Sequence, residues 1–192
     1  APTRVRLRGW LAFGSVRAMT AMARQIPFRL LPIDGEAFDS WLLMYAHMMA
    51  TTPGSIVEHV GLDTASISGD ARSVLMSAPR ELFDRLSAVA GIPDHRLLAT
   101  VEPLRRYSDL TRTTYGSKPQ RVATVTRASR YCPRCLAENA GRWMLDWRIP
   151  WFLGCPIHKI LLAEGCPVCG AQQRSRSIRA MNVPIHPTRC RA

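Results

Sequence analysis

The seventeen residues GCPIHKILLAEGCPVCG, residues 154–170, place three cysteines and one histidine in two short turns of the form C-P-x-[HC]. A turn of this form presents two metal ligands on one side of the chain. A tetrahedral cation needs four ligands, so each turn must be completed by residues elsewhere in the sequence. The positions of the other cysteines and histidines therefore decide how many metal sites the chain has.

The first of these turns has a matching turn upstream. Two cysteines spaced C-x2-C precede it by nineteen residues, and two such turns together supply the four corners of a tetrahedron. Burying several thiolates without a cation would be very costly, and sulfur with one imidazole suits zinc best. We predict a structural zinc site with no position left for water, because protein ligands take all four corners: Cys132, Cys135, Cys155 and His158.

The second turn begins another site, for which we predict a second zinc ion. Cys166 and Cys169 form one half, and Cys190 is the natural third ligand. The fourth ligand is either His186, four residues before Cys190, or a residue beyond Ala192. The alternative, buried free thiols, leaves the repeated turn unexplained.

The net charge of +12 is confined to the second half of the chain. Residues 1–104 hold ten Lys/Arg and ten Asp/Glu, whereas residues 105–192 hold sixteen Lys/Arg against four Asp/Glu. All but two of these sixteen cations are arginine, the side chain whose shape best fits a phosphate. This asymmetry predicts a polyanionic partner, most simply nucleic acid; the alternative is a solvated surface.

Residues 1–23 read as a basic, flexible arm rather than a signal peptide, because Arg17 interrupts a short apolar stretch. No apolar run approaches the length of a membrane span. All six cysteines lie in the last third, four of them in C-x-x-C pairs. This clustering favours metal binding in a reducing cytoplasm over disulfides in a secreted protein.

Residues 24–104 read as a helical domain. The chain is extended to Phe38; Asp39 or Ser40 then offers an N-cap for an apolar helix, and Pro53 starts a second helix that Gly61 ends. After a loop at 62–74, a helix starts near Pro79, Gly91 ends it, and Pro93 begins a further helix that runs to Pro103. This pair fits a helix-turn-helix, although an ordinary helical hairpin gives the same pattern.

Residues 105–129 are polar and basic, and we predict a linker or an arm along a nucleic acid. The predicted phosphate contacts are Arg105, Arg106, Arg112, Lys118, Arg121 and Arg127. Residues 130–192 then form the tandem zinc-finger module, with small β elements. Its aromatic residues are expected to form a core around the first site, the alternative being a surface on which bases stack: Trp143, Trp147, Trp151 and Phe152.

Two stretches resemble one known family. LPIDGEAFDSWLLMYA at 31–46 is similar to its L-P-x-x-x-E-x-x-x-S-W-L box. RYCPRCLAENAGRWMLDWRIPWFLGCPIHKILLAEGCPVCG at 130–170 is similar to its Y-C-P-x-C-L…W-R-x-P-W…C-P-x-H-x-x-L-L…C-P-x-C-G block. The family is TniQ, the target-selection proteins of transposons related to TnsD, and the length resembles its compact members in CRISPR-associated transposons.

The resemblance implies a helix-turn-helix and tandem zinc fingers in a protein without catalytic activity of its own. Similar proteins connect a targeting element, in some cases an RNA-guided complex, to the AAA+ ATPase TnsC. The first four predicted ligands match the family's first finger, and Cys166 and Cys169 begin the second. The chain departs from the family where a paired cysteine turn is represented only by Cys190.

Three functions compete at this point. The first is a recruitment adaptor that binds a TnsC-type ATPase and nucleic acid. The second is a small DNA-binding transcription regulator that uses the helix-turn-helix. An enzyme is disfavoured, because the chain lacks a P-loop or an H-E-x-x-H motif, and Asp34, Glu36 and Asp39 read better as a capped helix start than as a metal-dependent nuclease site. The sequence leaves the oligomeric state open.

Overall fold

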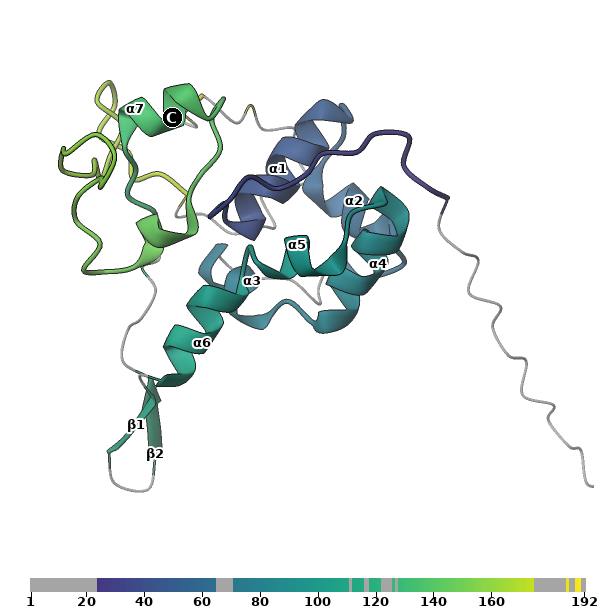
Figure 1. Ribbon diagram of the computed structural model, residues 1–192, viewed down its shortest axis with the longest axis horizontal. Coiled ribbons are helices and arrows are strands. Elements are labelled where there is room, and N and C mark those ends of the chain that lie inside the picture. The colour runs from purple at the N-terminus through teal and green to yellow at the C-terminus, as the bar shows by residue number, and fades with distance from the viewer. Residues whose placement is uncertain are drawn as a thin grey trace, which may run out of the picture.

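The computed structural model describes residues 24–64, 71–110, 112–115, 118–121, 126, 128–174, 186, 189 and 190. This part of the chain is mainly helical, as predicted, with few strands (Figure 1). The predicted arm at residues 1–23 lies outside it. The elements are α1 (Phe38–Met48), α2 (Pro53–His59), α3 (Ala71–Ser77), α4 (Arg80–Ala90), α5 (Asp94–Leu98), α6 (Glu102–Leu110), β1 (Arg112–Tyr115), β2 (Lys118–Arg121), α7 (Pro133–Glu138) and the 3-10 helix η2 (Leu145–Arg148).

Helix α1 is the centre of the helical part. Nine of its eleven residues are buried, which is typical of a helix covered on all sides. The extended segment before it crosses its surface (Figure 1), and two α1 side chains hold that segment. Trp41 donates from its indole nitrogen to the Leu30 carbonyl at 2.8 Å, and the Tyr45 hydroxyl donates to the Phe28 carbonyl at 2.9 Å.

Local rules place several helix ends correctly. Helix α2 starts at Pro53, and the Thr52 hydroxyl caps it by accepting from the Ser55 amide at 3.1 Å. Helix α4 starts directly after Pro79 and ends at Gly91, whose φ of 63° is the left-handed conformation that glycine adopts without strain. These boundaries confirm the predictions made from proline and glycine.

Other predicted ends are wrong. Helix α1 begins at Phe38 without a side-chain cap, so Asp39 and Ser40 lie inside its first turn. The helix after Pro93 ends at Leu98, and Pro103 lies in the first turn of α6 rather than after a helix. Helix α3 begins at Ala71, inside the predicted loop at 62–74; residues 65–70 lie outside the described part.

The segment predicted as a linker contains regular structure. Helix α6 continues to Leu110, and β1 and β2 then form an antiparallel hairpin in which Arg112 pairs with Arg121 and Tyr115 with Lys118. The hairpin extends from the end of α6, away from the other helices and from α7 (Figure 1). It carries three of the six residues predicted to contact phosphates.

The helical part and residues 128–174 are joined through backbone hydrogen bonds. The Ala37 amide donates to the Trp143 carbonyl at 2.9 Å, and the Leu145 amide donates to the Gly35 carbonyl at 2.8 Å. The Leu145 side chain enters the core formed by the helices. The two segments predicted as successive domains therefore share an interface of both backbone and core.

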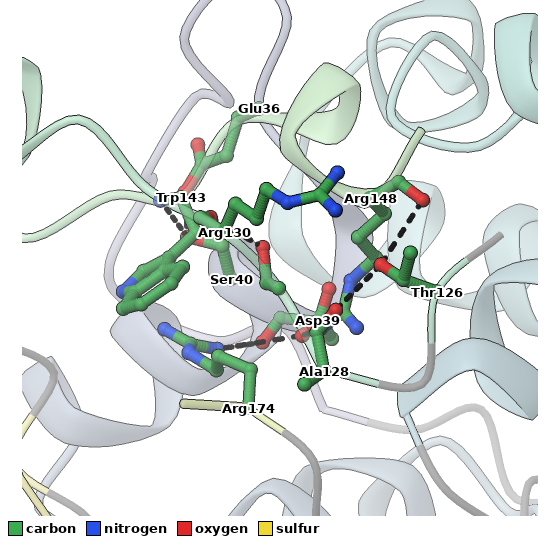
Figure 2. Close-up of polar contacts among 10 residues, drawn as sticks. Glu36, Asp39, Ser40, Thr126, Ala128, Arg130, Trp143, Arg148 and Arg174 are labelled. Carbon is green, nitrogen blue, oxygen red and sulfur yellow. Dashed lines mark hydrogen bonds and ion pairs between the residues drawn. The ribbon is translucent and has the colours of Figure 1, made fainter. Parts of the chain in front are cut away.

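Buried ion pairs cross the same interface. Arg148 donates to the Asp39 carboxylate at 2.7 Å, with both side chains almost fully buried, and Arg174 approaches the same carboxylate oxygen at 3.5 Å (Figure 2). Beside them, Glu36 pairs with Arg142 at 3.3 Å. Burial raises the pKa of the Glu36 carboxyl, although Arg142 and other donors oppose this shift.

Ser40 completes the contact between the two parts. Its hydroxyl donates to Glu36 at 2.9 Å and accepts from the Trp143 amide at 2.8 Å. The carboxylates that the sequence suggested as a helix start are therefore partners of distant arginines, and this explains why Asp39 does not serve as a cap.

We predict that Asp39→Asn destabilises the protein by about 3–5 kcal/mol, because it leaves Arg148 and Arg174 buried without their countercharge. The matched control is Asp34→Asn, since Asp34 pairs with Arg96 at 3.2 Å while 93% exposed; it should cost less than about 1 kcal/mol. Urea unfolding curves of both variants measure the difference. Equal unfolding midpoints would show that the buried pair does not hold the two parts together.

Of the helices in the described part of the chain, none has the length and apolar character needed to cross a lipid bilayer.

Candidate metal centre

The first predicted site is brought together. The ligand atoms of Cys132, Cys135, Cys155 and His158 all lie within 4.8 Å of one another. Cys132 is the N-cap of α7 and Cys135 lies in its first turn, where Pro133 starts the helix. The other two ligands come from the turn at 155–158, so the four converge from the two predicted halves.

The spacing of these atoms fits a tetrahedral cation. The His158 Nδ1 atom lies 3.4 Å from the Cys132 sulfur, 3.2 Å from that of Cys135 and 3.5 Å from that of Cys155. The Cys135 and Cys155 sulfurs are 3.5 Å apart. Around a zinc ion with zinc–sulfur bonds of about 2.3 Å, the edges of a tetrahedron are roughly 3.6–3.8 Å long. The site therefore needs only a small expansion to hold zinc.

A carboxylate orients the histidine ligand. The Nε2 atom of His158 lies 2.9 Å from the Glu138 carboxylate at the end of α7. With its Nε2 hydrogen donated to Glu138, the ring presents Nδ1 to the sulfurs. This second contact fixes both the tautomer and the direction of the ring, which is the arrangement expected for a histidine that binds a metal.

The thiols of the metal-free cluster differ in acidity. Burial and the neighbouring cysteines raise the pKa of the Cys135 thiol to about 12. Burial would also raise that of Cys155, but hydrogen bonds from His158, Cys135 and Ile157 lower it to about 6. A bare cluster would thus hold protons on some sulfurs, whereas a bound cation favours thiolate at all of them.

The two C-P-x-[HC] turns have the same backbone geometry. In the first, the Lys159 amide donates to the Cys155 carbonyl and the Cys155 amide donates to the Ile160 carbonyl. In the second, the equivalent bonds run from Gly170 to Cys166 and from Cys166 to Ala171. Lys159 and Gly170 occupy the same left-handed position, with φ of 55° and 70°. The repeated sequence pattern therefore encodes a repeated structure.

The second predicted site is brought together in part. The sulfurs of Cys166, Cys169 and Cys190 lie within 4.8 Å of one another, in a more exposed place than the first cluster. His186, the predicted fourth ligand, does not join them: its ring stacks edge-on against that of His47 in α1, at 4.8 Å between centroids. The spacing to Cys190 was misleading because the fold places His186 over α1.

The predicted aromatic core is right for two of the three tryptophans. Trp143 and Trp147 are buried around the first cluster with their ring centroids 5.8 Å apart, and Phe152 packs partly buried against them. Trp151, in contrast, is 51% exposed. The prediction of a core position is wrong for Trp151.

The predicted phosphate contacts lie in different places. Arg105 is half-buried and donates to the carbonyls of Leu75 and Ala78, both at 2.8 Å, whereas Arg106 is exposed. Arg127 lies outside the described residues. The other three are in the hairpin: Arg112, Lys118 and Arg121.

These observations define a class: a helical protein fused to a cysteine-rich module whose two clusters could bind metal ions, consistent with zinc. The TniQ family matches residues 27–162, which is most of the chain. The chain belongs to the TniQ family, and it is therefore a transposition-associated protein. A search of curated proteins finds no match.

We predict two zinc ions in the wild-type protein by elemental analysis. Cys132→Ser should remove the first ion and expose Trp143 and Trp147, seen as a red shift of fluorescence, because the ligands organise the core around them. Cys169→Ser should lower the zinc count by one without that shift. His186→Ala is the matched control and should keep both ions. If His186→Ala lost one zinc ion, His186 would be a ligand of the second site after all.

Proposed function

We propose that this protein is a target-selection adaptor in transposition, without catalytic activity of its own. It would bind a TnsC-type AAA+ ATPase and link it to a DNA-guided or RNA-guided targeting complex. The setting would be the cytoplasm, where thiols stay reduced and available for zinc. Membership of the TniQ family supports a role in transposition. The exposed surface of the cysteine-rich module supports a role in binding a protein partner.

The structural observation that carries the proposal is a group of exposed aliphatic side chains on that module. Ile157 at the tip of the first turn is 73% exposed, Leu161 is 80% exposed, and Val168 at the tip of the second turn is 92% exposed. Apolar side chains held outward on rigid, metal-supported turns are suited to a protein partner that covers them. A first metal site closed by four protein ligands would give its turn rigidity rather than chemistry.

A transcription regulator is the second candidate, supported by the helix–glycine–helix arrangement of α4 and α5. Two features weaken it. Helix α5 has only five residues, and Arg96, one of the few groups on it able to reach DNA, donates to the Pro32 carbonyl and pairs with Asp34. A regulator should prefer one duplex site by about 10³-fold or more; an adaptor should show little sequence preference and a steep salt dependence.

We predict that the double variant Ile157→Asp/Val168→Asp loses binding to a TnsC-type ATPase in a co-purification assay, because two carboxylates cannot be buried in an apolar contact. The variant should keep its zinc, since neither residue is a ligand. The matched control is Met48→Asp at the end of α1, another exposed apolar residue. Retained ATPase binding by the double variant would remove these turns from the docking surface.

We also predict that Arg121→Glu/Arg127→Glu weakens nucleic-acid binding and lowers its salt dependence by about one unit of slope for each phosphate that is no longer bound. Metal content should not change. The control is Arg24→Glu/Arg29→Glu, which reverses the same charge at two exposed positions of the neutral half. If both double variants weaken binding equally, only the net charge matters, and residues 105–129 make no specific contact with the nucleic acid.

A further inference from the structure

Trp151 is the exception among the tryptophans that the structure describes. Trp41, Trp143 and Trp147 are buried in the two cores, whereas about half of the Trp151 side chain is exposed. An indole is a large apolar surface, and its exposure is unfavourable unless something covers it. The surroundings of Trp151 indicate what could cover it.

The backbone holds Trp151 in a fixed place. The Phe152 amide donates to the Ile149 carbonyl at 3.1 Å, which closes a tight turn with Pro150 at its second position. Ile149 packs against the helical core, and the Arg130 guanidinium donates to the Pro150 carbonyl at 2.7 Å. The turn is therefore anchored on both sides, and Trp151 stands on it as a preformed surface.

A second aromatic ring lies beside Trp151. The Tyr107 ring, on α6, is 4.9 Å from it between centroids, at an interplanar angle of 50°. Neighbouring Arg106 is exposed and pairs with Glu102 at 3.4 Å, on the surface of α6. Tyr107 lies in the last turn of α6, and the hairpin begins two residues after the end of that helix, at Arg112. The aromatic pair thus stands near the base of the hairpin.

The charge around this pair favours a polyanion over an apolar protein surface. Residues 106–127 contain five Lys/Arg and a single acidic residue, Asp109. Proteins that bind single-stranded nucleic acid commonly combine aromatic side chains with a basic surface. The bases stack on the aromatic rings, and the phosphates contact the cations. Bases inside a duplex already stack on one another, so the exposed part of the Trp151 indole suits an unpaired base.

We propose that Trp151, backed by Tyr107, stacks on an unpaired base of a nucleic acid whose phosphates run along the end of α6 and the hairpin. This inference rests on the nucleic-acid contact in the proposed function and names its chemistry. It also separates the roles of the exposed apolar residues: Trp151 contacts a base, while the tips of the two cysteine turns contact protein.

The test compares Trp151→Ala, Trp151→Phe and the matched control Leu153→Ala, an exposed apolar residue two positions away. Fluorescence anisotropy measures binding to a labelled single-stranded DNA, to the RNA of the same sequence and to the DNA duplex. Trp151→Ala should weaken single-strand binding about tenfold, with Trp151→Phe close to wild type and Leu153→Ala unchanged. The salt dependence should stay the same, because the substitution removes no cation that binds a phosphate. The preferred single strand, DNA or RNA, identifies the source of the base.

Three results would overturn the inference. Trp151→Ala could bind single strands as wild type does, it could lose duplex binding equally, or Leu153→Ala could show the same loss. If wild type binds all three probes but the variants do not differ, only the stacking role fails. If wild type binds none of them, the nucleic-acid half of the proposed function fails as well. If Trp151→Ala instead loses ATPase binding alone, the indole belongs to the protein-docking surface.

Discussion

The buried carboxylate of Asp39 is the contact on which the arrangement of the protein depends. Arg148 and Arg174 reach it from positions 109 and 135 residues further along the chain, at 2.7 and 3.5 Å. Burial lowers the pKa of Arg174 to about 10, against the attraction of Asp39, so its guanidinium remains charged at neutral pH. Removing the Asp39 carboxylate would leave Arg148 and Arg174 buried without their countercharge, which costs several kcal/mol. The ion pairs thus fix the orientation of a module whose own shape comes from its cysteine turns.

The sequence predicts those parts of the structure that local rules govern. Paired turns reveal the first cluster because ligand spacing is a property of a few neighbouring residues, and Pro53 and Gly91 mark helix ends for the same reason. The Asp39–Arg148 pair could not be predicted, since no pattern links residues so far apart. From its neighbours in the sequence, Asp39 is a candidate N-cap. In the fold its carboxylate instead pairs with the buried Arg148. His186 was misplaced by the same kind of reasoning, from sequence spacing alone.

Arg105 shows why composition alone misleads about residues 105–129. A basic, polar stretch reads as a solvated linker, yet this guanidinium donates to two carbonyls at and just after the end of α3 and lies 5.5 Å from the Phe83 ring. Carbonyls at a helix end have no partner within the helix, and an arginine can satisfy several of them at once. Arg105 therefore stabilises the packing of α6 on α3, and the cations suited to phosphate begin at Arg106.

Rigidity connects the fold with the proposed role. An adaptor that holds two partners loses less conformational entropy on binding if its contact surfaces are already fixed relative to each other. In this protein the first cluster fixes the turn that carries Ile157, the proline turn fixes Trp151, and the Asp39 pairs fix both relative to α1. A flexible linker between two separate domains would let these surfaces move independently. The shared interface instead allows the position of one partner to determine the position of the other.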